Sequence, residues 1–259
     1  MDHMAPPLAD AQDYWEAMAL AGWVLARTST LRVGHLVLCD GFRHPTVLAR
    51  QAVTLDHASA GRFELGIGWG SVPSEFDVFG ISPTEPRERV ARLGETLEIL
   101  RRLWTGDAVD FDGAHFVLGG ARQRPVPLGR IPITIGGTGK RTLALVREYA
   151  DWWNVPVNQL DLVEQRRELA GDARVSIQQL VALVPSESAR EEVTATATRR
   201  YGGYGSLAIG TVDELVEHFA QTPAERVYVW FADFAPVETI AAFADVIAAF
   251  TGSAGPGAR

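Results

Sequence analysis

The stretch from Arg62 to Phe76 contains the residue pattern that most directly suggests a ligand site. In a short strand over 62–68, Gly66 and Gly68 share one face with Glu64, because strand side chains alternate. Glycines on such a face either let a ligand approach the backbone or only relieve crowding inside a sheet or barrel. The spacing alone leaves both interpretations open. The glycine and polar loop that follows is the first candidate for the mouth of a site.

Histidine and cysteine side chains do not predict a metal centre. The chain has six histidines and a single cysteine, Cys39, which excludes an intrachain disulfide and a cysteine-clustered zinc site. No pair of histidines combines with a carboxylate at a metal-binding spacing. His35 falls in a predicted buried strand, and His44 is placed to cap the helix that begins at Pro45. Both therefore have structural explanations.

The composition indicates an ordinary globular enzyme-sized chain. It has 259 residues, of which 47% are hydrophobic and 22% charged, with a formal net charge of −8. The acidic balance argues against a nucleic-acid or anionic-membrane partner. No apolar run reaches the roughly 18 to 20 residues of a membrane span, and residues 1–7 lack the pattern of a signal peptide. We therefore expect a cytoplasmic protein.

Apolar periodicity predicts strands and helices that alternate along the chain. The segment 31–38 is apolar on both faces, which is typical of a buried parallel strand. The segment 109–118 predicts a hairpin around Asp112-Gly113. Six segments are strand candidates for a parallel sheet: 31–38, 62–68, 131–135, 152–155, 175–184 and 227–231.

Helices are predicted in the segments between these strands. The clearest covers 85–104, where Arg89 and Arg92 stand four residues after Glu85 and Glu88, a favourable spacing for ion pairs. The others are expected at 11–27, from Pro45 to about 58, after Gly139 to Ala150, before Ala170, at 187–201, from Thr211, and from Val237 to Phe250.

This alternation predicts an α/β fold built on a parallel sheet, with 1–259 forming a single domain. Within it, 73–130 forms a loop, helix and hairpin insertion, and 252–259 is a frayed tail. A closed TM-type (β/α)8 barrel needs eight strands. Six candidates therefore indicate either an open doubly wound sheet or a barrel with missing units. The lack of a strand before the first helix favours a barrel without its first one or two βα units.

Four stretches together resemble the luciferase-like monooxygenase family, and their order and spacing match over essentially the whole chain. That family consists of TIM-barrel oxidoreductases that use coenzyme F420 or reduced flavin mononucleotide (FMN). Its members normally begin with a strand, a helix and a second strand that often ends in Asp-His, which Asp2-His3 matches. The four stretches are 36–45, 54–68, 89–106 and 135–154.

The resemblance implies cofactor-binding positions at the ends of several strands. The Cys39-Asp40 junction matches a non-proline cis peptide that supports the flavin ring in related enzymes. Gly136, Gly137 and Thr138 match a loop whose amides approach the ribityl or phosphate portion, and glycines before a helix suit an anion. The remaining implied positions are Gly68, Trp69, Gly70 and Ser71 in the loop beside the ring, and Trp153 and Asn154 at the next strand end.

His3 is the candidate proton donor or acceptor beside the reactive ring atom, because a histidine titrates near neutral pH. The alternative is that a residue so near the terminus is disordered. Related deazaflavin sugar dehydrogenases have a glutamate proton donor where this chain has 71–74, so sugar phosphate chemistry is not supported. Glu75 is nearby, but its match to that role stays open. Six tryptophans suggest a flat or aromatic substrate pocket, or are simply core: Trp15, Trp23, Trp69, Trp152, Trp153 and Trp230.

The resemblance therefore implies an F420-dependent dehydrogenase or reductase, or an FMN-dependent monooxygenase that works with a separate flavin reductase. The Ala- and Arg-rich composition leans toward the F420 users. The expected partners are a small-molecule substrate and a second copy of the chain in a homodimer. A flavin-binding barrel without turnover is the alternative. An unrelated doubly wound nucleotide binder is a third interpretation, although Cys39-Asp40-Gly41 is not a dinucleotide fingerprint.

Overall fold

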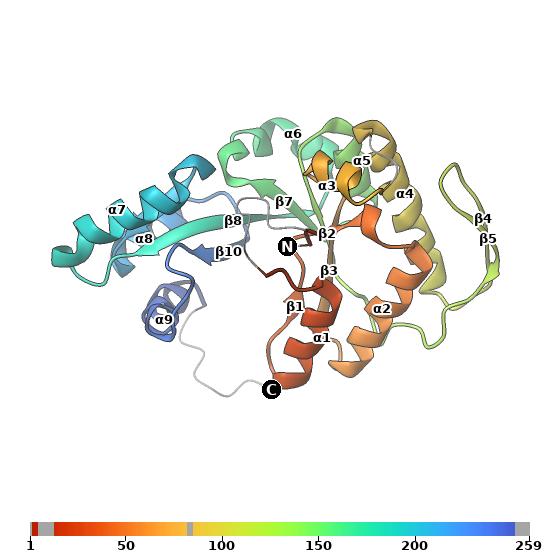
Figure 1. The fold of residues 1–259 in the computed structure, drawn as a ribbon, viewed down its shortest axis with the longest axis horizontal. Coiled ribbons are helices and arrows are strands. Elements are labelled where there is room, and N and C mark those ends of the chain that lie inside the picture. Colours follow the sequence, from red (N-terminus) through yellow and green to blue (C-terminus); the bar gives the residue numbers. More distant parts are fainter. Residues whose placement is uncertain (1, 5–12, 82–84, 252–259) are drawn as a thin grey trace. The chain divides into compact units, whose positions relative to one another are not determined.

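The computed structural model describes residues 2–4, 13–81 and 85–251. These fall into two compact units. Unit 1 comprises 1–153 and 166–173, and unit 2 comprises 154–165 and 174–259. The frayed tail predicted at 252–259 lies outside the described residues. Figure 1 shows the order of the elements in each unit.

Unit 1 is built on parallel strands with helices packed against them. Strand β3 (Phe63–Gly68) is central and fully buried, which fits its glycine and apolar sequence. It pairs with β1 (Val33–Gly34), β2 (Leu38–Cys39) and β6 (Ile133–Gly136), all in parallel register. Consequently, the carboxyl ends of β2, β3 and β6 meet at one edge of this sheet.

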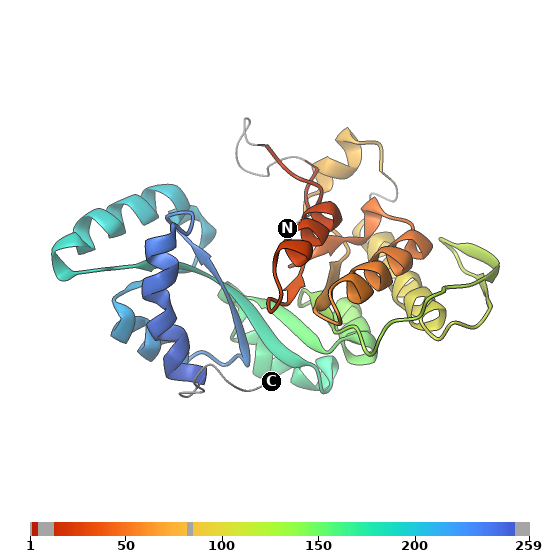
Figure 2. The same ribbon diagram turned by 90° about the horizontal axis from the view of Figure 1, so that it is seen from below.

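The helices of unit 1 cover this sheet through apolar stripes. Helix α2 (Pro45–Ala58) begins at a proline, and the His44 side chain accepts a hydrogen bond from the Thr46 amide, as predicted. It packs against α4 (Pro86–Leu103), and Figure 2 shows the two helices side by side. Leu93, Leu97 and Leu100 are completely buried on α4. The other elements are α1 (Ala17–Arg27), α3 (Pro73–Val78), α5 (Lys140–Tyr149) and the antiparallel hairpin β4 (Val109–Asp112) with β5 (Val117–Ala121).

Two elements contribute residues to both units. Strand β7 (Trp152–Pro156) leaves unit 1 after Trp153, and α6 (Leu162–Ala170) enters it at Arg166.

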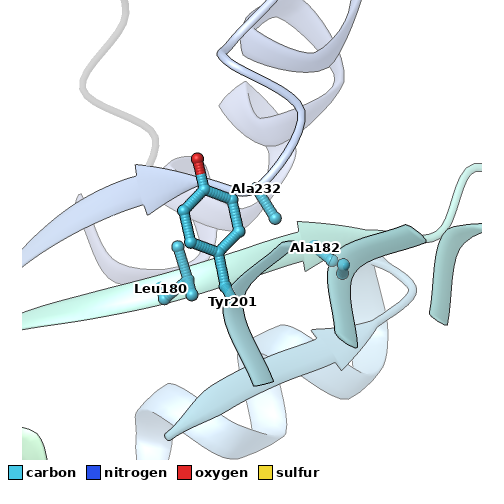
Figure 3. Packing of buried hydrophobic residues seen from close by; sticks show 5 residues of the cluster. Leu180, Ala182, Tyr201 and Ala232 are labelled. Atoms are coloured by element: carbon cyan, nitrogen blue, oxygen red, sulfur yellow. The ribbon is translucent and has the colours of Figure 1, made fainter. Parts of the chain in front are cut away.

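Unit 2 is organised around the long strand β8 (Arg174–Leu183). It pairs in parallel with β10 (Arg226–Phe231) and β9 (Leu207–Gly210). The alternation of its side chains gives two apolar clusters on opposite faces. Val181 packs with residues of α8 (Val212–Ala220) and α9 (Val237–Thr251). On the other face, Leu180 and Ala182 pack with Ala232 and with Tyr201 from α7 (Arg190–Tyr201), as Figure 3 shows.

The structure corrects three local predictions. The expected continuous strand over 31–38 is wrong, because the chain leaves the strand conformation between Gly34 and Leu38. Strand β9 was not predicted, since its Leu207-Ala208-Ile209-Gly210 sequence is too short to give a clear period. Helix α3 was expected as loop, although Pro73 at its first position is a recognised helix-start signal.

Candidate functional site

Asp2 and His3 are held at the carboxyl edge of the unit 1 sheet. The Cys39 amide donates a hydrogen bond to the Asp2 carboxylate at 2.9 Å, and Arg43 forms an ion pair with the same carboxylate. Arg43 also pairs with Glu16. Asp2 is therefore fixed beside the end of β2, and the alternative that His3 is disordered is not what the structure shows.

His3 lies against a buried carboxylate from α3. Its Nδ1 is 2.9 Å from the Glu75 carboxylate, and the neighbouring Met4 amide donates to the other oxygen of Glu75 at 2.6 Å. Glu75 is only 7% exposed. The ring also makes an edge contact with Tyr14. His3 is thus an oriented imidazole, which is what proton transfer at a fixed position requires.

The glycines of β3 mainly make room for the segment between β1 and β2. A Cβ on Gly66 would lie 1.7 Å from the carbonyl oxygen of His35, and one on Gly68 would lie 2.9 Å from a Val37 methyl. Real side-chain carbons do not approach so closely. The sequence left open whether these glycines admit a ligand or relieve crowding. Relief of crowding explains Gly66, and the Val37 side chain occupies the space beside Gly68.

The predicted cis peptide at Cys39-Asp40 is wrong. The non-proline cis bond lies three residues earlier, between Leu36 and Val37. Cys39 instead belongs to β2, where it is paired in register with Gly68, and the chain passes directly into a short 3-10 turn at Asp40–Phe42. This regular pairing fixes an ordinary extended backbone at Cys39.

Asp40 and Cys39 are buried and engaged with the protein itself. Asp40 forms an ion pair with Arg92, whose guanidinium also donates to the Asp40 carbonyl at 2.6 Å and to the Arg43 carbonyl at 3.0 Å. Burial raises the pKa of the Asp40 carboxyl, and the Arg92 charge opposes that effect. Burial likewise raises the pKa of the Cys39 thiol to about 12. Both side chains are therefore buried beneath the strand ends and contact other residues of the protein.

The loop after β3 is held by Arg89, for which the sequence predicted only an ion pair with Glu85. Arg89 is 2% exposed, and its guanidinium lies 4.9 Å from the centroid of Trp69 and 4.4 Å from that of Phe76. It also donates to the Gly70 carbonyl at 3.4 Å. Stacking of a desolvated guanidinium on two rings is a strong contact for a loop. Gly70 has φ of +88°, a conformation that favours glycine.

The sequence predicted that Arg89 and Arg92 form ion pairs with Glu85 and Glu88. It did not predict that both arginines are buried. Both arginines continue the stripe of Leu93, Leu97 and Leu100 toward the start of α4, at the three- and four-residue steps of a helix face. That spacing was the available signal. In the structure, they tie α4 to the loop at Gly70 and to Asp40.

The loop after β6 offers backbone amides to an anion. Gly137 has φ of +115°, and Gly139 is the N-cap of α5 with no side-chain cap. The Trp153 indole donates to the Gly137 carbonyl at 2.8 Å, and Arg166 donates to the Thr138 carbonyl. These contacts hold the loop by its carbonyls. The first-turn amides of α5 and its positive dipole end therefore fit a phosphate group. Lys140 and Arg141 are exposed.

The remaining predicted positions divide between the two units. Ser71 is exposed on the loop after β3, whereas Trp153 is fully buried beside Gly137. Asn154 belongs to unit 2, where its amide donates to the carbonyl and hydroxyl oxygens of Ser176, each at 3.2 Å. Trp15 and Trp23 are 72% and 63% exposed, so the tryptophans do not form one pocket.

The described residues contain neither a candidate metal cluster nor a candidate membrane-spanning helix. Within 2–4, 13–81 and 85–251, no group of three His, Cys, Asp or Glu side chains could hold a metal ion. The same part of the chain contains no helix that is long and apolar enough to cross a membrane.

Residues 2–220 match the family model described as luciferase-like monooxygenase. The chain belongs to this family. The match covers the ends of β2, β3 and β6 that carry the candidate site in unit 1, and it excludes the interpretation as an unrelated doubly wound nucleotide binder.

Curated relatives include both dehydrogenases and monooxygenases. An F420-dependent glucose-6-phosphate dehydrogenase from Nocardia farcinica is 39% identical over 137 residues, which are 52% of this chain and 39% of that protein. A 4-hydroxyprotoasukamycin monooxygenase from Streptomyces nodosus subsp. asukaensis is 44% identical over 81 residues, or 31% of this chain and 21% of that protein. The chain thus spans about two fifths of the length of the curated dehydrogenases it matches.

Solved structures confirm the expected fold, an α/β architecture of the TIM-barrel type. An F420-dependent secondary alcohol dehydrogenase matches with a TM-score of 0.79 at 20% identity, over 96% of this chain and 88% of that one. The EDTA monooxygenase from Chelativorans matches with a TM-score of 0.79 at 14% identity, over 98% of this chain and 82% of that one. At these identities the likeness concerns the fold alone.

Proposed function

We propose that this chain is an oxidoreductase that binds coenzyme F420 or reduced FMN at the carboxyl edge of the unit 1 sheet. One observation carries the proposal. The parallel strands β2, β3 and β6 end at this edge, and there an oriented His3 and the uncapped start of α5 both occur. Enzymes with this fold keep their sites at the carboxyl ends of their strands.

The cofactor, when bound, supplies the hydride or oxygen chemistry. The amides of Gly136 and Gly137 and the start of α5 would hold its phosphate, and the loop at Gly68–Ser71 would line the side of its ring. Ser71 is exposed, so it is the residue of this loop that is open to a ligand. Cys39 and Asp40 would support this surface without touching the cofactor, because their side chains are buried.

The favoured reaction is oxidation of a hydroxyl group on a small organic substrate, or its reversal. In the forward direction, His3 would take the proton of the substrate hydroxyl, and a bound cofactor would supply the hydride acceptor that the oxidation requires. The C–O single bond becomes a carbonyl, so atoms and electrons balance. The F420-dependent glucose-6-phosphate dehydrogenases among the curated relatives support this choice, as does the Ala- and Arg-rich composition. Ser71 still departs from the glutamate of the sugar dehydrogenases, so a sugar phosphate is not proposed.

Oxygenation with reduced FMN is the second candidate, and it is favoured by the likeness to the 4-hydroxyprotoasukamycin monooxygenase. It would require a separate flavin reductase as partner. We further propose a cytoplasmic homodimer for either activity. A flavin-binding protein without turnover stays the alternative.

The test is a fluorescence titration of the purified protein with F420 and with FMN, followed by turnover with a panel of secondary alcohols and their ketones. We expect saturable binding of one cofactor and a change in its visible absorbance when an accepted alcohol is added. Binding without turnover on any alcohol, ketone or oxygen-coupled assay would support the alternative. Binding of neither cofactor would contradict the proposal.

A further inference from the structure

The carboxylate of Glu75 has no role in the proposed reaction so far, yet it is buried and both of its oxygens are in contact with residues 3 and 4. It is 7% exposed, although it lies on the short surface helix α3. One oxygen lies 2.9 Å from His3 Nδ1, and the other accepts from the Met4 amide at 2.6 Å. Both oxygens therefore face donors from the segment that carries the imidazole.

We propose that Glu75 is a positioning residue that holds the His3 ring with its proton on Nδ1 and leaves Nε2 as the atom that exchanges a proton with the substrate. This inference rests on the proposed function for its chemical role. An ionised carboxylate can only accept hydrogen bonds, so its partner nitrogen must carry the hydrogen. In a neutral imidazole, the other nitrogen then presents its lone pair.

The same geometry argues that Glu75 is not itself the proton donor. A carboxyl group that delivers protons needs an oxygen directed at the substrate, whereas both oxygens of Glu75 are directed at His3 and Met4. The chain has serine at 71 and 74, so the loop provides no second carboxylate at those positions. We therefore assign proton transfer to His3, and Glu75 affects the reaction by orienting the His3 ring.

A separate anchor makes this role distinguishable from simple structural support. Asp2 accepts a hydrogen bond from the Cys39 amide and forms an ion pair with Arg43. Loss of the Glu75 carboxylate should therefore let the His3 ring change its orientation and tautomer, while Asp2 keeps its contacts with Cys39 and Arg43. A residue that only stabilised the fold would not change the tautomer selectively.

The test uses the full chain labelled with ¹⁵N-histidine, with the His3 resonances assigned by His3→Gln. Long-range ¹H–¹⁵N spectra then report which ring nitrogen is protonated. We expect the Nδ1–H tautomer in the wild type and a shift toward Nε2–H in Glu75→Leu. Glu75→Gln should retain much of the wild-type state, because its amide oxygen can still accept from Nδ1–H. Asp77→Asn, an exposed neighbour on α3, is the matched control and should leave the tautomer unchanged.

Kinetics provide the second readout. In Glu75→Leu, we expect kcat to fall on the order of 10- to 100-fold, the effect of misplacing a catalytic group, while cofactor affinity stays within about twofold. Glu75→Gln should recover part of the loss. An unchanged tautomer in a folded Glu75→Leu, or in Glu75→Ala if the leucine variant does not fold, would overturn the proposal, because both variants remove the acceptor for Nδ1–H. The tautomer is measured without cofactor, so failure of the wild type to bind F420 or FMN would count against the proposed function alone.

Discussion

The two ends of the unit 1 strands use polar side chains in opposite ways. At the amino ends, Arg62 donates to the carbonyls of Ser59, Leu31 and Leu25 at 2.9, 2.7 and 3.1 Å. Asp151 likewise accepts from the Ile133 amide at 2.9 Å and pairs with Arg130. These side chains are used to join loops of the chain to one another.

At the carboxyl ends, the buried charges hold other side chains or loops in place and leave groups that can meet a ligand. Arg92 fixes Asp40, Arg89 fixes the loop at Gly70, and Glu75 fixes His3. The start of α5 keeps its amides without a side-chain cap. We infer that charge at the amino ends joins loops of the chain, whereas buried charge at the carboxyl ends both stabilises unit 1 and positions the residues of the proposed site.

The largest expected effect is at Arg92. Replacing it in Arg92→Leu leaves the Asp40 carboxylate buried without its cation, so the free energy of unfolding should fall by about 3 to 5 kcal/mol. Chemical denaturation measures this loss. The double variant Arg92→Leu, Asp40→Leu should recover a large part of it, because no unpaired charge remains. A loss below about 1 kcal/mol in the single variant would show that this pair is solvated, and the contrast between the ends would weaken.

A smaller effect is expected at the amino ends. Arg62→Gln removes several charge-assisted bonds to loop carbonyls, but water can partly replace them, so we expect a loss of about 2 kcal/mol in unfolding free energy. Cofactor affinity should not change. Arg50→Gln on the exposed surface of α2 is the matched control and should have almost no effect on stability. A loss of cofactor binding in a folded Arg62→Gln would contradict the division of roles between the two ends.

How far the sequence predicted these two ends depends on the range of the interactions involved. The β3 segment and the glycine loops at 68–71 and 136–138 follow from local pattern and from resemblance. The break between β1 and β2 could not be predicted, because an apolar run does not indicate where its backbone leaves the strand conformation. The roles of Arg92 and Glu75 depend on contacts 52 and 72 residues away in sequence. Single-sequence periodicity carries no information at that separation.

The smallest effect is expected at Cys39, which lies at the site end but is buried. Because burial raises its pKa to about 12, only on the order of one thiol in 10,000 is ionised at pH 8. Native protein should therefore resist iodoacetamide at that pH, whereas unfolded protein should react fully. Mass spectrometry gives the extent. Stoichiometric modification of the native protein would show that the thiol is accessible.

The raised pKa of Cys39 also gives a pH dependence with a defined sign. The unfolded thiol ionises near its ordinary pKa of about 8.5, before the folded one does. The contribution of Cys39 to stability is therefore complete below the unfolded pKa and declines as the pH rises toward 12. Cys39→Ala should remove this decline when unfolding free energy is compared across that range.

The central claim is that the carboxyl end of the unit 1 sheet binds the cofactor, and a pair of glycines tests it most directly. Gly137 has φ of +115° in the proposed phosphate loop, whereas Gly61 has φ of +82° two residues before β3, at the amino end. Both Gly137→Ala and Gly61→Ala place a β-carbon at a positive φ, which costs on the order of 1 to 3 kcal/mol, so each variant is first shown to be folded by circular dichroism. The measurement is the dissociation constant of F420 or FMN, whichever binds, for the wild type and both variants. We predict a weakening of about tenfold or more in Gly137→Ala and no change in Gly61→Ala. Equal affinities in all three proteins would contradict the account.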